Sequence, residues 1–131
     1  GNMIETHRDL VDKNRELVQL FVNASIIGWY NFLYGDAKPG LEMIKKLNPD
    51  MDDKKLAAER EQVIKLQLVD SGDALSKGIG AIDNARIRDF GARMIKAGIY
   101  KAGEVDPGAV ATERFVNKKV GMDLKKSVAS K

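Results

Sequence analysis

The stretch from residue 15 to residue 34, RELVQLFVNASIIGWYNFLY, constrains the fold more than any other part of the chain. Its large apolar residues recur at three- and four-residue steps, the spacing that places side chains on one side of an α-helix. Gln19, Asn23 and Asn31 interrupt the apolar character, which argues against a membrane-spanning helix. We therefore expect a long helix with a broad apolar face, around which the rest of the chain packs. Two neighbouring rows make up this face: Leu17, Phe21, Ala24 and Gly28, and beside them Val18, Val22, Trp29 and Phe32.

Size and composition predict one soluble globular domain. The chain has 131 residues, of which 44% are hydrophobic and 3 are proline, enough for a real core. The 22 Lys and Arg residues exceed the 19 Asp and Glu residues only slightly. They form no concentrated basic segment with aromatic residues between them, so we expect no nucleic-acid partner. The absence of cysteine excludes disulfides and thiolate chemistry, and is compatible with either cytoplasm or periplasm. The opening Gly1-Asn2-Met3 carries no export-signal pattern and resembles a point inside a longer protein.

Local signals predict a mainly α fold with about four main helices and one short N-terminal strand. The segment 69–83 contains three glycines and is expected to be an ordered loop. Residues 1–117 are expected to form the helical portion, and residues 118–131 a basic, frayed tail. In chain order the predicted elements are a strand at 3–6, a brief helix ending at 13, helices at 15–34 and 37–47, a helix capped by Asp50 or Asp52 that ends near 68, a helix at 84–97, and a short final helix beginning at 107.

Capping residues support these boundaries. Asn14 and Asp83 precede helices, where a short polar side chain can accept a hydrogen bond from a free backbone N–H. Gly98 follows a helix and predicts a Schellman ending, while Asp106-Pro107 is typical of a helix start. We expect the flanking helices to bury Leu41, Ile44 and Leu47 in one case and Ile87, Phe90, Met94 and Ile95 in the other, with Phe115 and Val116 anchoring the final helix.

No group of residues has the pattern of a catalytic or metal site. His7 is the only histidine, and its place near a helix start favours a surface or capping role. The aspartates at 50, 52 and 53 lack the glycine and glutamate of a calcium-binding loop, and Gly78-Ile79-Gly80 lacks the third glycine and the preceding strand of a dinucleotide fingerprint. Trp29 and Tyr30 could stack on a ligand, but on an apolar helix they are more typical of core. We expect no catalytic residues, no metal ligands, no cofactor and no enzymatic activity.

Several segments that follow one another in a fixed order are more informative than any single motif. They are the opening 36 residues, LNPDMDD at 47–53, VDSGDALSKGIGAIDNAR at 69–86 and MIKAGIYKAGEVDPG at 94–108. Together they resemble the C-terminal part of the periplasmic solute-binding proteins of ABC importers, in the group covering nitrate, sulfonate, taurine and thiamine-precursor uptake. Arg15 stands where that family commonly has proline, and Ile87 where it often has an aromatic residue. Within the long helix the matching positions are Glu16, Leu17, Val18, Phe21, Val22, Ala24, Gly28 and Trp29.

This resemblance implies a fragment of a two-lobed α/β fold of the type II periplasmic-binding-protein kind. The whole protein would capture a small solute, such as nitrate, a sulfonate, taurine or a pyrimidine, and deliver it to an ABC permease. Its location would be the periplasm or another extracytoplasmic, membrane-associated site. Ligand-binding residues at the edge of the cleft would be Asn2, Asp73, Gly78 and Asp83, and most of the other cleft residues would lie outside this chain.

Two other interpretations remain open at this stage. The chain could be a free-standing helical protein-interaction module that holds a partner with its apolar face. It could also derive from an enzyme of thiamine-pyrimidine synthesis, an interpretation that rests on shared ancestry alone. We expect solute binding by this chain alone to be weak or absent, because a cleft needs two walls and only part of one is present. We also expect the chain to self-associate, most simply as a two-fold dimer.

Overall fold

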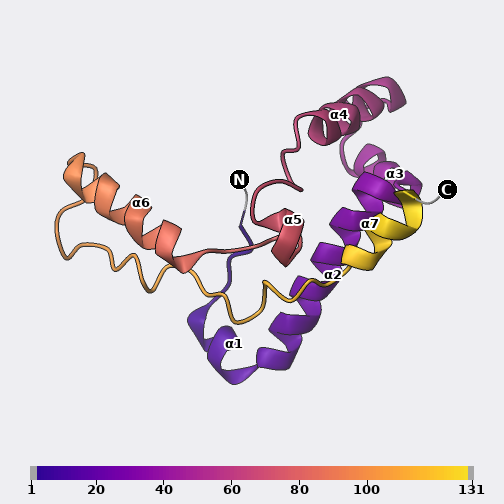
Figure 1. The fold of residues 1–131 in the computed structure, drawn as a ribbon. Helices are drawn as coiled ribbons and strands as arrows, with labels where there is room; N and C mark the ends of the chain where they lie inside the picture. The colour runs from indigo at the N-terminus through magenta and orange to yellow at the C-terminus, as the bar shows by residue number, and fades with distance from the viewer. Residues whose placement is uncertain (1–2, 130–131) are drawn as a thin grey trace.

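The computed structural model describes residues 3–129, and all of the regular secondary structure in this range is α-helical (Figure 1). Helices account for 58% of these residues, which confirms the mainly α prediction. The short stretch at residues 74–77 is a single helical turn inside the segment that we expected to be only a loop. The helices are α1 (Arg8–Lys13), α2 (Arg15–Tyr34), α3 (Lys38–Leu47), α4 (Asp53–Lys65), α5 (Ala74–Lys77), α6 (Asn84–Lys96) and α7 (Met122–Ala129).

The predicted strand at Met3–Thr6 is wrong. These residues have no regular structure, and the described chain contains no strand at all. Met3 and Ile4 are exposed, so neither packing nor backbone pairing holds the segment extended. A strand gains its stability from a neighbouring strand, and none is within reach here.

Helix α2 is the centre of the molecule, and its two sides have different surroundings. One side, which we call the core face, consists of Val18, Val22, Ile26, Tyr30 and Leu33, all buried. At 3.6 residues per turn the opposite side is also apolar but largely exposed, and we call it the open face. The open face consists of Leu17, Leu20, Phe21, Ala24, Ile27 and Gly28.

The cover over the core face is mostly irregular chain. Ile79, which follows α5, and Phe115 are buried against α2. Residues 97–121, which we call the return segment, lead from α6 back to α2 (Figure 1). Tyr30 lies deepest, with only 1% of its surface exposed, and its hydroxyl accepts a hydrogen bond from the Ile79 backbone N–H at 3.3 Å. This bond satisfies a backbone donor that the irregular cover leaves without a helical partner.

The two ends of α2 are held by side chains from different parts of the chain. At the N-terminus, the predicted cap Asn14 accepts a hydrogen bond from the Leu17 backbone N–H. At the C-terminus, Arg60 of α4 donates hydrogen bonds to the carbonyl oxygens of Phe32 and Leu33, at 2.5 and 2.9 Å. The last carbonyls of a helix have no partner within it, so Arg60 replaces water there and ties α4 to α2.

The C-terminal part of the chain differs from the prediction in two ways. Asp106-Pro107 starts a turn and no helix, because the Asp106 carboxylate accepts from the Gly108 N–H and its carbonyl accepts from the Ala109 N–H. Helix α7 instead forms further on, within the segment that we expected to be frayed, and packs against α2. Phe115 is buried as expected, but in the return segment. Packing on the long helix, and not local propensity, decides where the final helix forms.

Helix α6 stands apart from α2 and is joined to it only through irregular chain (Figure 1). Its predicted ends are confirmed, since Asp83 caps the N-terminus and Ile99 N–H donates to the Met94 carbonyl in the Schellman pattern. The predicted burial of Ile87, Phe90, Met94 and Ile95 is wrong, because no residue of α6 is buried and 60% of the surface of Phe90 is exposed. Ile44 and Leu47 of α3 are exposed as well, again contrary to prediction. Periodicity identifies an apolar face, but a face is buried only where another element covers it.

The contact between Gly121 and Tyr30 gives a direct test of the core. Gly121 has a φ of +72°, and a Cβ built on it would lie 2.7 Å from Cδ2 of Tyr30. We predict that Gly121→Ala lowers the free energy of unfolding by about 2–4 kcal/mol, from the left-handed backbone and the forced shift of Tyr30. Chemical denaturation followed by circular dichroism measures this change.

The matched control is Gly40→Ala in α3, where a Cβ meets nothing within 4 Å. This replacement should stabilise the protein by about 0.5–1 kcal/mol, because glycine weakens a helix relative to alanine. Equal effects of the two substitutions would contradict the close packing of Gly121 on Tyr30.

Candidate functional site

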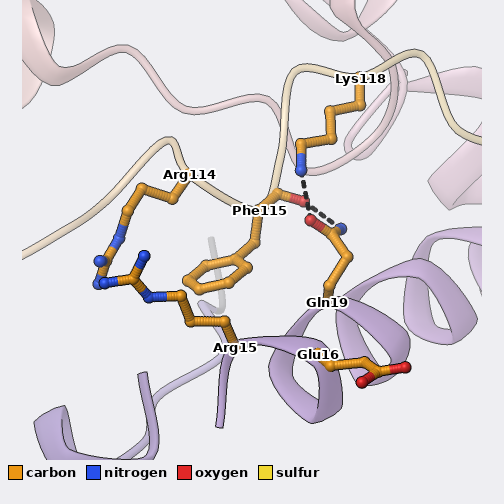
Figure 2. A pocket seen from close by; sticks show the side chains of 6 residues that line it. All are labelled: Arg15, Glu16, Gln19, Arg114, Phe115 and Lys118. Atoms are coloured by element: carbon orange, nitrogen blue, oxygen red, sulfur yellow. Dashed lines mark hydrogen bonds between the residues drawn. The ribbon is translucent and has the colours of Figure 1, made fainter. Parts of the chain in front are cut away.

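A cavity of about 360 Å³ lies between the first turns of α2 and the return segment. Figure 2 shows its side chains, three of them basic, gathered around one aromatic ring. We call it the arginine pocket. Its lining consists of Arg15, Glu16, Gln19, Arg114, Phe115 and Lys118.

Gln19 holds the two walls of the arginine pocket together. Its Nε2 donates to the Phe115 carbonyl oxygen at 2.9 Å and to Asn23 Oδ1 at 2.7 Å. Its Oε1 accepts a hydrogen bond from Lys118 Nζ (Figure 2). One amide side chain therefore fixes the backbone at Phe115 and the ammonium group of Lys118 relative to α2. This arrangement uses both ends of the amide and leaves the pocket with a defined shape.

The two arginines are held differently. The Arg114 guanidinium lies over the Phe115 ring, 5.5 Å from its centre, and one of its nitrogens is 3.1 Å from an Asp12 carboxylate oxygen. Arg15 has no ion pair or hydrogen bond through its guanidinium within residues 3–129. Figure 2 shows both guanidinium groups on one side of the ring, whereas the Glu16 carboxylate points the other way. The side of the pocket nearest the arginines is therefore positively charged.

A second cavity, of about 280 Å³, lies where α2, α4 and α7 come together. Its polar part is a network around Asp70, which is buried with 5% of its surface exposed. The Tyr34 hydroxyl donates to Asp70 Oδ2 at 2.6 Å, and Lys125 Nζ lies 2.7 Å from the same oxygen. The cavity lining is Leu33, Tyr34, Val63, Ile64, Gln67, Asp70 and Lys125.

This network changes the acidity of two of its members. Burial raises the pKa of Tyr34, and the hydrogen bond to Asp70 raises it further. The hydrogen bond from Lys125 to Asp70 raises the pKa of the ammonium group. Both groups therefore hold their protons more tightly than usual. The network is suited to fastening α7 to α2. The pKa values of Tyr34 and Lys125 both move away from neutral pH, whereas an acid–base catalyst needs a pKa near it.

The residues predicted at a cleft edge hold the chain between α5 and α6. Asp73 lies 3.3 Å from Lys77 and 3.6 Å from Arg86. Asp83 caps α6, and hydrogen bonds from the backbone N–H groups of Arg86 and Ala85 lower the pKa of its carboxyl.

Gly78 has a φ of +98°, and a Cβ there would lie 3.3 Å from Lys119 Cα. A side chain is therefore strained at this position for structural reasons alone. Asn2 lies outside the described residues. Asp73, Gly78 and Asp83 line neither the arginine pocket nor the second cavity, so their role at a cleft edge stays a prediction.

Sequence reasoning missed the residues of both cavities. The two walls of the arginine pocket are joined by a hydrogen bond between residues 96 positions apart, and no local motif connects such distant segments. The one available signal was Arg15, which we noted only as a departure from a family pattern. Asp70 gave no signal either, since a single aspartate in a loop is unremarkable until the fold buries it.

The only histidine, His7, lines neither cavity. His7 precedes α1 and is exposed, and its side chain makes no capping hydrogen bond. Among residues 3–129, no group of three or more His, Cys, Asp or Glu is placed to hold a metal ion. In the same part of the chain, no helix has both the length and the hydropathy needed to cross a membrane.

Comparisons with known proteins give no further guidance. The chain matches no protein-family profile, and no similar curated protein or solved structure was found.

The Asp70 network predicts that the protein loses stability at alkaline pH. Tyr34 and Lys125 have raised pKa values in the folded state, relative to ordinary values of 10.0 and 10.5. Above about pH 10 the folded protein therefore binds more protons than the unfolded chain, and stability falls as pH rises. At neutral pH this contribution is fully present. Denaturant unfolding from about pH 8 to about pH 11 measures the slope.

Lys125→Met tests which groups cause this slope. At neutral pH it should cost about 1–2 kcal/mol, the lower part of the range for a charged hydrogen bond, because the Lys125 side chain is 41% exposed. At alkaline pH the difference from the original protein should shrink. Lys54→Met removes the same charge from an exposed position on α4. It should change neither the free energy of unfolding at neutral pH nor its slope at alkaline pH. A constant difference across the pH range would contradict the role of Lys125.

Proposed function

We propose that this chain is the C-terminal helical portion of the solute-binding component of an ABC importer. In this proposal the whole protein captures a small solute of the nitrate, sulfonate, taurine or pyrimidine kind outside the cytoplasm and passes it to the permease. The chain would supply packing surface and part of the binding protein, and it would carry out no catalysis. The ordered resemblance of its segments supports the family, and the surface of α2 supports the idea that other polypeptide covers it.

The open face of α2 is the observation that carries the proposal. Phe21 and Leu20 each expose 60% of their surface, and Leu17 and Ile27 are exposed beside them. Gly28 has nothing within 4 Å of the position of a Cβ, so no other part of the chain packs on the helix at this position. The helix is therefore apolar on two opposite sides, while the chain covers only one.

A helix that is apolar around most of its circumference is normally buried in a larger protein. Fully burying a large apolar side chain stabilises a fold by about 1.5–3 kcal/mol, so several such residues left in water forfeit a substantial contribution. Contiguous exposed apolar surface of this kind usually marks an interface. In a two-lobed binding protein the missing cover would be the first lobe, against which the C-terminal helices pack.

The open face also suits a second candidate, a free-standing helical interaction module. In that case the cover would be a separate partner protein, held as one helix holds another. The coding sequence upstream of Gly1 separates the two candidates. An export signal followed by an α/β lobe supports the first, and a start codon close to Met3 supports the second.

We predict that the isolated chain associates through the open face. Light scattering coupled to gel filtration should give a mass above that of the 14.5 kDa monomer, and Phe21→Glu should return it towards the monomer mass. The matched control is Phe90→Glu on α6, since Phe90 exposes the same 60% of its surface. Phe90→Glu should leave the mass unchanged. A monomeric chain, or equal effects of the two substitutions, would contradict this prediction.

The same two substitutions also test the family proposal. Here they are made in the longer protein that includes the polypeptide encoded upstream of Gly1. If a lobe covers the open face, Phe21→Glu there buries a charge and should destabilise the protein by about 3 kcal/mol or more, whereas Phe90→Glu should have little effect. Equal melting temperatures for the two variants would mean that no lobe covers Phe21.

A further inference from the structure

We propose that the arginine pocket is a binding site for a small oxyanion, held between Arg15 and Arg114. The ligand would be a sulfate, phosphate, sulfonate or carboxylate group. The inference rests on residues 12–118 and uses no residue of the open face, from which the proposed function is argued.

The size of the arginine pocket suits a small ligand. Its volume of about 360 Å³ lies at the lower end of the range for ligand pockets. The aromatic ring of Phe115 is buried in the core and forms a rigid wall. Gln19 of α2 is hydrogen-bonded to Phe115 and Lys118 of the return segment, so the two walls are joined before any ligand enters. A site that is already formed loses little freedom on binding.

The charge of the arginine pocket favours an anion. Three lining residues are cations, and the one lining carboxylate, Glu16, points away from both arginines (Figure 2). Asp12 offsets the charge of Arg114, which leaves Arg15 uncompensated within residues 3–129. Like charges on one side of a pocket repel, and an anion between them turns this repulsion into attraction.

The chemistry of the guanidinium group selects the class of anion. A guanidinium group presents parallel N–H donors that match two oxygens of a planar or tetrahedral oxyanion. Arg114 is preset by the Phe115 ring on one side and by Asp12 on the other. Arg15 is the first residue of α2, a helix of 20 residues whose positive end adds to the attraction. The group bound is therefore an oxyanion. Chloride is the matched control, because it carries the same kind of charge but lacks the two oxygens that a guanidinium group binds in parallel.

The experiment is a titration of the full chain with sodium sulfate, sodium phosphate, methanesulfonate and acetate at ionic strength held constant with chloride, followed by backbone amide NMR shifts. We expect saturable shifts at residues 14–19 and 114–118 for at least one of these anions. Arg15→Gln should weaken binding about tenfold, the effect of losing one charged hydrogen bond. Because Arg15 has no partner in the described chain, this variant should keep the helical circular dichroism of the original protein.

Two further variants complete the test. Arg15→Lys keeps the charge but loses the paired donors, so binding should fall between that of the original protein and that of Arg15→Gln. Arg88→Gln, which removes the same charge from an exposed residue of α6, should leave binding unchanged. Shifts that stay linear in anion concentration, or an equal loss of binding in Arg15→Gln and Arg88→Gln, would overturn the proposal. The order of affinity among the four anions identifies the group that the pocket takes.

Discussion

Burial of the core face of α2 under irregular chain is the constraint on which the rest of the structure depends. Tyr30 is almost wholly buried, and Gly121 passes so close to its ring that no side chain fits there. Irregular cover brings backbone groups into the core, and each of them needs a partner. The Tyr30 hydroxyl provides one for Ile79, and the Gln19 side chain provides another for the Phe115 carbonyl. Polar groups on a largely apolar helix therefore hold its cover in place.

The same cover builds the arginine pocket. Phe115 is at once a core residue and a wall of the pocket, and its neighbours Arg114 and Lys118 are placed by the path of the return segment. Whatever loosens this segment from α2 therefore removes the pocket together with part of the core. At the other end of α2, Asp70 joins Tyr34 to Lys125 and fastens α7, which continues directly from the return segment. Stability and the candidate site are linked through this one stretch of chain.

The open face gives α2 a second role that the chain itself does not use. Helices α1, α4 and α7 pack residues against the buried cluster on the core face, among them Val11, Val63 and Leu124. Helix α6 stands away from α2 (Figure 1). A fold that leaves Leu20 and Phe21 in water keeps a strong drive for association. That drive is satisfied in the same physical way by a further lobe, a partner protein or a second copy. The identity of the cover is a question about the neighbouring polypeptide, and the open face specifies only its apolar character.

The sequence by itself determined the local features. Helix α2, the caps at Asn14 and Asp83 and the Schellman ending at Gly98 were predictable, because each depends on residues within one or two turns. For α4 the sequence left Asp50 and Asp52 as alternatives, and the structure uses Asp52. Local propensity was not sufficient at residues 3–6, which lack a pairing partner, or at residues 107–129, where packing on α2 placed the final helix late in the chain.

Only the tertiary structure decided which apolar face of α2 is buried, that Phe90 stays in water, and that Arg15 meets Arg114. Periodicity shows that a helix has apolar sides, but it contains nothing about the segment that will cover one of them. Both cavities join residues far apart in the chain, Gln19 with Phe115 and Asp70 with Lys125, and such contacts follow from the path of the whole chain. The charge of the arginine pocket is visible in the sequence only as scattered basic residues, because what gathers them is the burial of Phe115 against α2.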